Sequence, residues 1–87
     1  MNTPQSWDEA RRAVLDMLAG IAPDQDVEAV AGDVDLRQAL DLDSLDFLNF
    51  VVGLDEHFGV HTAEADYPEL ATLDSAVAYL VGRSAHT

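Results

Sequence analysis

The sequence contains no cysteine among its 87 residues. A disulfide framework is therefore excluded, and so is any chemistry that uses a thiol of the protein itself. Long apolar runs are missing too, because no segment approaches the roughly 20 residues that a membrane-spanning helix needs. Residues 1–20 lack a basic stretch followed by an unbroken apolar core, so they do not resemble a signal peptide. These absences lead us to expect a cytoplasmic protein without a membrane partner.

Positive charge is also scarce. Four basic residues stand against 17 acidic ones, which gives a net charge of −13 and a pI near 4.1. Nucleic acids and anionic membrane surfaces are disfavoured as partners, because phosphate contacts need lysine or arginine. Proteins with basic patches fit instead, since opposite charges steer their encounter. The acidity also has a simpler explanation, namely that it keeps a small protein soluble.

Apolar residues make up 48% of the chain, which is enough for a single domain over residues 1–87 with a modest core. Their spacing is helical, and no segment of four or more residues alternates convincingly between apolar and polar. We therefore expect an all-α fold, a four-helix bundle with three main helices and one short helix. A long loop should connect the first two main helices.

The first helix is expected from about Ser6 to Ala19, with Ser6 and Glu9 as its capping box. Gly20 and Pro23 should end it. Apolar residues at helical spacing predict its core-facing side: Trp7, Ala10, Val14, Leu18 and Ile21.

The long connection that follows covers residues 23–40 and must cross the surface. Asp33 or Asp35 is expected to cap a short helical turn over residues 36–40. Five apolar residues can hold the connection to the core: Val27, Val30, Val34, Leu36 and Leu40.

The second long helix should begin at Asp43 or Ser44 and end near Phe58, with Gly59 as its C-cap. One stripe of this helix is predicted to face the core: Phe47, Phe50, Val51, Leu54 and Phe58. A second apolar stripe, made of Leu45, Leu48 and Val52, lies on a different face. Either the helix is central and buries both stripes, or the second stripe is exposed and meets a partner. We favour partner contact.

The last part of the chain carries two further helix signals. Residues 64–67 predict one short helical turn, which Pro68 should stop. Thr72 is the expected N-cap of the last helix, which should end near Val81 or Gly82. The residues expected to face inward are Leu73, Val77, Leu80 and Val81.

Ser44 is the most prominent candidate for a reactive residue, yet no neighbour in the sequence could activate it as a nucleophile. A serine hydrolase needs a base within hydrogen-bond reach, and only carboxylates flank Ser44. His57 lies on the same helix about 20 Å away, at 1.5 Å rise per residue. Helix capping explains Asp43 and Asp46 in "DSLD", because negative charge is favourable at a helix start. It does not explain why a serine is displayed beside an apolar stripe.

Metal chemistry finds equally little support in the sequence. The acids between Asp33 and Asp46 do not match a calcium-binding loop, because glycine and glutamate are missing at the required positions. His57 and His61 are four residues apart, but Gly59 breaks the helix between them. Weak divalent-ion binding that neutralises repulsion remains an interpretation of the acidic cluster.

The segment "LDLDSLDFLNFVVGLDEHFGV", residues 40–60, resembles the modification site and recognition helix of acyl carrier proteins. That family is marked by Asp-Ser-Leu at the start of its second helix, an apolar helix and a Phe-Gly close. The resemblance extends over nearly the whole chain, from the amphipathic first helix to "TLDSAVAYL" in the last one. It implies an acyl-carrier-like bundle, and we expect a free-standing carrier.

The resemblance implies that Ser44 is the attachment site of a 4′-phosphopantetheine arm, with Asp43 and Leu45 on either side. A phosphopantetheinyl transferase would move the arm from coenzyme A to the Ser44 hydroxyl. The thiol of the arm would carry an acyl or aminoacyl group as a thioester. An imported thiol would account for the absence of cysteine, and the chain itself would catalyse nothing.

The resemblance also implies where partners bind. Acyl-loading and acyl-processing enzymes with basic patches would contact the second helix of a monomeric carrier through Asp46, Leu48, Asn49, Val52, Asp55 and Glu56. Asn49 departs from the family, because many fatty-acid carriers have glutamate there. Fatty-acid, polyketide, peptide and other specialised acyl pathways therefore stay open. Two alternatives also remain, an unmodified acidic interaction module and a divalent-ion sensor.

Overall fold

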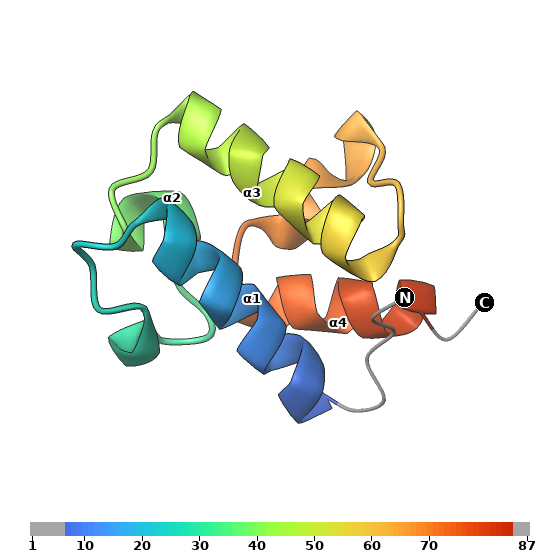
Figure 1. Cartoon of the computed structure of the whole chain (residues 1–87), viewed down its shortest axis with the longest axis horizontal. Coiled ribbons are helices and arrows are strands. Elements are labelled where there is room, and N and C mark those ends of the chain that lie inside the picture. Colours follow the sequence, from blue (N-terminus) through green and yellow to red (C-terminus); the bar gives the residue numbers. More distant parts are fainter. Residues whose placement is uncertain (1–6, 85–87) are drawn as a thin grey trace.

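The computed structural model describes residues 7–84, and this part of the chain is helical without a β-strand. Three longer helices dominate, α1 (Trp7–Ile21), α3 (Ser44–Phe58) and α4 (Leu73–Ser84). Three shorter elements lie between them, η1 (Val27–Ala29), α2 (Leu36–Ala39) and η2 (Glu64–Leu70). Helix α1 packs against both α3 and α4, as Figure 1 shows. The expected all-α fold is confirmed.

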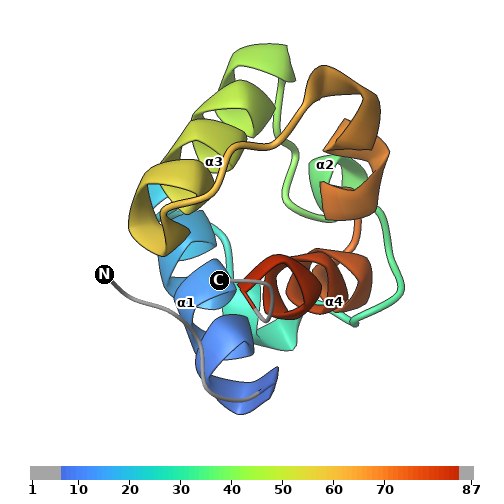
Figure 2. The same ribbon diagram turned by 90° about the vertical axis from the view of Figure 1, so that its right-hand side faces the viewer.

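Helix α2 is tied to the junction between η2 and α4, and the two regions lie side by side in Figure 2. The Leu36 amide donates to the Ala71 carbonyl at 2.8 Å, next to an isolated β-bridge between Asp35 and Thr72. Asp35, and not Asp33, caps α2, because its carboxylate accepts from the Arg37 amide at 2.8 Å. The middle of the long connection is thereby fixed to the rest of the bundle.

The boundaries of α3 agree with the sequence. Asp43 is the N-cap, Ser44 is the first helical residue, and the helix ends at Phe58. Gly59 follows in the left-handed conformation with φ of 67°, which glycine adopts without steric cost.

Other boundaries differ from the prediction. Helix α1 continues to Ile21 and α4 to Ser84. Pro68 does not stop the short turn, since η2 runs through it to Leu70. The fixed φ of proline suits a 3₁₀ helix, and the Pro68 carbonyl still accepts from the Ala71 amide. Ser6, the expected N-cap of α1, lies outside the described residues.

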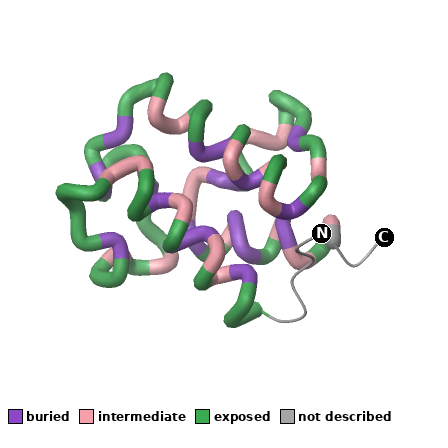
Figure 3. The backbone as a smooth tube through the Cα atoms, viewed as in Figure 1, coloured by how far each residue is buried: buried purple, intermediate pink, exposed green. Residues whose placement is uncertain are grey.

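The core forms where α1, α3 and α4 face one another, and buried positions line the inner sides of these helices in Figure 3. The core stripe of α3 is largely as predicted, with Phe50, Val51, Leu54 and Phe58 buried and Phe47 partly buried. Buried residues that the periodicity did not single out are Leu15, Leu42, Leu70 and Ala76.

Two of the predicted core positions, Trp7 and Val34, are wrong. Trp7 is 44% exposed because it occupies the first position of α1, at the end of the helix. Val34 is 38% exposed, because the chain turns at this point and Leu36 enters the core instead.

Candidate functional site

Ser44 lies in the first turn of α3, at a helix start built by its two acidic neighbours. The Asp43 carboxylate accepts from the Asp46 amide at 2.8 Å, and the Asp46 carboxylate accepts from the Asp43 amide at 3.3 Å. This reciprocal capping box satisfies backbone donors that a helix start otherwise leaves unpaired. The Ser44 side chain takes no part in the capping and is exposed.

The hydroxyl of Ser44 has one neighbour that the sequence reasoning missed. Arg37 Nη2 donates to Ser44 Oγ at 3.3 Å, from the other side of the loop between α2 and α3. The Arg37 guanidinium carbon lies 5.8 Å from the centroid of the Phe47 ring, within cation–π range. The scarcity of positive charge is the signal that could have revealed Arg37, since it is the sole lysine or arginine between Arg12 and Arg83.

Arg37, which contacts Ser44, also lines two hollows of the surface. One has a volume of about 280 Å³ and lies between α3, α2 and η2, bounded by Asp35, Arg37, Phe47, Tyr67, Pro68 and Ala71. The other, of about 340 Å³, is bounded by Asp35, Arg37, Gln38 and Leu42. Ser44 itself is exposed, which leaves room for a substituent on its hydroxyl.

The second apolar stripe of α3 is exposed, as predicted. Leu45 is 64% exposed, Leu48 43% and Val52 48%. Asn49 and Glu56 are exposed as well. The alternative in which a central helix buries both stripes is thus excluded, and α3 presents an apolar strip that begins next to Ser44.

Asp46 and Asp55, the other two acids expected on the recognition surface, already have bonding partners within the chain. Asp46 is partly buried within the capping box described above. The Asp55 carboxylate accepts from the Thr62 amide at 3.0 Å and from Thr62 Oγ1 at 2.6 Å. Asp55 therefore fixes the chain after α3, and Glu56 presents its side chain more openly.

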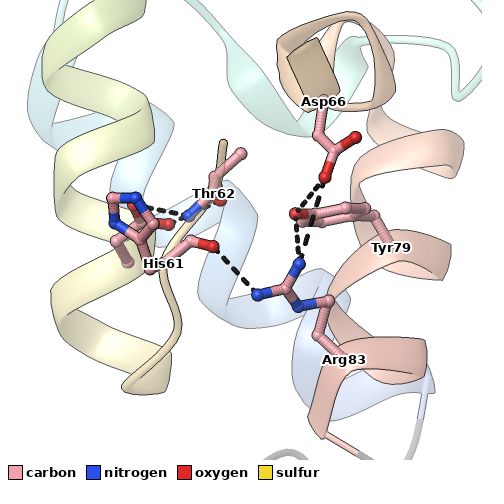
Figure 4. Close-up of polar contacts among 6 residues, drawn as sticks. His61, Thr62, Asp66, Tyr79 and Arg83 are labelled. Carbon is pink, nitrogen blue, oxygen red and sulfur yellow. Dashed lines mark hydrogen bonds and ion pairs between the residues drawn. The ribbon is translucent and has the colours of Figure 1, made fainter. Parts of the chain in front are cut away.

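A polar network then joins this segment to α4, as Figure 4 shows. Arg83 donates to the His61 carbonyl at 2.9 Å and to the Tyr79 hydroxyl at 3.1 Å. The Tyr79 hydroxyl in turn donates to Asp66 at 3.2 Å. Burial raises the pKa of Tyr79, and nearby Arg83 opposes that rise. The network holds the far end of α3 in place.

Within residues 7–84, no group of three or more His, Cys, Asp or Glu side chains could hold a metal ion. No helix in this range is long and apolar enough to cross a membrane.

Comparison with known proteins finds relatives that cover most of the chain. Residues 12–80 match the family model described as "Phosphopantetheine attachment site". The chain is 32% identical over 80 residues to "Polyketide-8 synthase acyl carrier protein 2" of Streptomyces avermitilis, covering 92% of this chain and 86% of that protein. It is 35% identical over 66 residues to "Acyl carrier protein" of Renibacterium salmoninarum, covering 76% of each.

A further relative, "Acyl carrier protein" of Rubrobacter xylanophilus, is 28% identical over 74 residues, which cover 82% of this chain and 91% of the relative. The chain belongs to the phosphopantetheine-attachment family of acyl carrier proteins. Members of this family are carriers and not enzymes. Their prosthetic group is a 4′-phosphopantetheine attached covalently to a serine.

Proposed function

We propose that Ser44 is the serine that carries the 4′-phosphopantetheine arm. The observation that carries this proposal is the position of Ser44, which is exposed in the first turn of α3 and left out of the capping box. Ser75, near the start of α4, is the instructive contrast, because its hydroxyl is bonded to Thr72. The residues around Ser44 fit the group, since a guanidinium lies at the hydroxyl and a helix N-terminus favours an incoming phosphate.

The part played by the chain is to present the hydroxyl. The oxygen of Ser44 would form a bond to the phosphorus on the pantetheine side of coenzyme A, and the pyrophosphate bond would break. Adenosine 3′,5′-bisphosphate would leave, and the hydroxyl proton would pass to a base of the phosphopantetheinyl transferase. The bound arm supplies a terminal thiol that holds acyl or aminoacyl groups as thioesters. We also propose that the carrier works in the cytoplasm, because coenzyme A, the source of the arm, is an intracellular cofactor.

Partner enzymes are proposed to bind the exposed face of α3. Leu45, Leu48 and Val52 offer apolar contact area next to the arm. Asn49 and the acids Asp46, Asp55 and Glu56 line the same helix and suit basic patches on acyl-loading and acyl-processing enzymes. Since the carboxylates of Asp46 and Asp55 already accept hydrogen bonds within the chain, we rank Glu56 first among these acids for contact with a partner.

The pathway is proposed at the level of acyl biosynthesis. The relatives include a carrier named for a polyketide synthase and others named simply as acyl carrier proteins. Asn49, at a position where many fatty-acid carriers have glutamate, argues against a general role in fatty-acid synthesis. A dedicated carrier for a polyketide, peptide or other specialised acyl pathway is at least as well supported. The mass of the protein isolated from its native host would reveal the cargo.

The test is to incubate the purified chain with coenzyme A and a promiscuous phosphopantetheinyl transferase and to measure its intact mass. The wild-type protein and Ser75→Ala should each gain one phosphopantetheine, and Ser44→Ala should gain none. An adduct that survives Ser44→Ala would overturn the assignment. If the wild-type protein stays unmodified but forms a stable partner complex that Ser44→Ala leaves intact, the exposed stripe belongs to an unmodified interaction module.

A further inference from the structure

Arg37 differs from two of the other three arginines of this acidic chain in the group that it binds. Arg12 forms ion pairs with Asp16 and Glu28, and Arg83 lies 4.0 Å from the Asp66 carboxylate. Among the described residues no carboxylate comes within ion-pair distance of the Arg37 guanidinium, although the chain carries 17 acids. The guanidinium instead donates to the uncharged hydroxyl of Ser44.

The rest of Arg37 is held firmly, which sets the position of its guanidinium. Its amide donates to the Asp35 carboxylate, and its carbonyl accepts from the Leu42 amide at 2.9 Å. The side chain then passes over the Phe47 ring to reach Ser44. The planar guanidinium, within cation–π range of this aromatic ring, is pre-organised, so it loses little freedom when it binds an anion.

We propose that Arg37 is a positioning residue that binds the phosphodiester formed on Ser44 and so fixes the base of the phosphopantetheine arm. This inference rests on the proposed attachment at Ser44. The phosphorus would be bonded to the oxygen that Arg37 Nη2 already contacts at 3.3 Å, which brings charged phosphate oxygens within reach of the same guanidinium. The guanidinium would thus exchange an uncharged hydroxyl acceptor for an anionic one, and arginine–phosphate pairs are often bidentate.

The consequence concerns the direction of the arm. Arg37 lines the hollow between α2, α3 and η2, so a phosphodiester held by it would leave Ser44 on the side of α2 and η2. The exposed stripe of Leu45, Leu48 and Val52 would then stay open for a partner. Without Arg37 the base of the arm would rotate freely in solvent.

The experiment compares the apo and the phosphopantetheinylated protein by NMR of arginine side chains and of phosphorus. Modification should shift the guanidinium N–H signals of Arg37 and leave those of Arg12 in place. In the modified protein, Arg37→Gln should move the phosphorus signal toward that of a free phosphodiester and narrow it. Arg37→Lys keeps the positive charge and should give a phosphorus signal between those of wild type and Arg37→Gln. Arg12→Gln removes the same charge away from the site and should leave the phosphorus signal unchanged.

The outcomes separate the two claims. Intact mass first shows whether the wild-type protein and each variant carry the adduct. An unmodified wild-type protein would overturn the attachment at Ser44 and this inference with it. A modified protein whose phosphorus signal is the same in wild type and Arg37→Gln would overturn the role of Arg37 and leave the attachment standing. The difference in phosphorus signal between the modified wild type and modified Arg37→Gln should also shrink at ~1 M salt, where charges are screened within about 3 Å.

Discussion

At the scale of single residues, the start of α3 shows how a short stretch combines folding and function. Asp43 and Asp46 hold the backbone through reciprocal hydrogen bonds, and this leaves the side chain of Ser44 available. The sequence revealed the cap and the serine, because both depend on neighbours along the chain. It did not reveal Arg37, because the contact with Ser44 crosses a loop and follows no helical period.

Removing the cap should destabilise the fold measurably. We expect Asp43→Ala to lower the free energy of unfolding by about 1 kcal/mol, because the Asp46 amide loses its acceptor. Urea unfolding followed by circular dichroism gives this value. Asp33→Ala is the control, since Asp33 is exposed and the cap of α2 is Asp35. Equal losses in the two variants would contradict the capping role.

Tyr79 gives a prediction for alkaline pH. Its pKa is raised by burial above the ordinary value of 10.0, so the folded protein retains a proton that the unfolded chain loses. The resulting stabilisation is present below the ordinary pKa and is lost as pH rises through the folded one. The free energy of unfolding should therefore fall above about pH 10, and fall less steeply in Tyr79→Phe. If the free energy of unfolding falls equally steeply with pH in Tyr79→Phe and in a Tyr67→Phe control, the role of Tyr79 is refuted.

At the scale of elements, α3 packs one face into the core and exposes a second apolar face to solvent. Leu54 is fully buried, and Leu48 is 43% exposed on the same helix. The apolar spacing predicted both stripes, but it could not decide which one the bundle covers. The same limitation explains the wrong predictions at Trp7 and Val34. Apolar spacing predicted that both side chains face the core, but within residues 7–84 no element covers them fully. Asp55 is a further case, because its partner Thr62 lies beyond the helix end.

The same leucine-to-alanine substitution should have different effects on the two faces of α3. Leu54→Ala should cost about 2–5 kcal/mol of unfolding free energy, because it leaves a cavity in the core. Leu48→Ala should change stability by no more than about 0.5 kcal/mol. In contrast, Leu48→Ala should lower kcat/KM for modification by the transferase. A Leu48→Ala protein that is modified at the wild-type rate would count against a recognition role for this stripe.

At the scale of the whole molecule, charge dominates. A net charge of −13 on 87 residues makes the folded state repel itself, and it also attracts basic partners. Added salt should therefore raise the melting temperature and slow partner association, since exposed charges are screened beyond roughly 10 Å at 0.1 M ionic strength. Magnesium should raise the melting temperature more than sodium at equal ionic strength. A melting temperature indifferent to both ions would contradict the self-repulsion.

The claim that matters most is that Ser44 is the acceptor. Its most direct test is tandem mass spectrometry of the transferase-treated protein, which reads the position of the added phosphopantetheine along the chain. We expect the whole adduct on the peptide that contains Ser44, and none on the peptide that contains Ser75. An adduct on any other residue, or an unmodified Ser44 after exhaustive treatment, would contradict it.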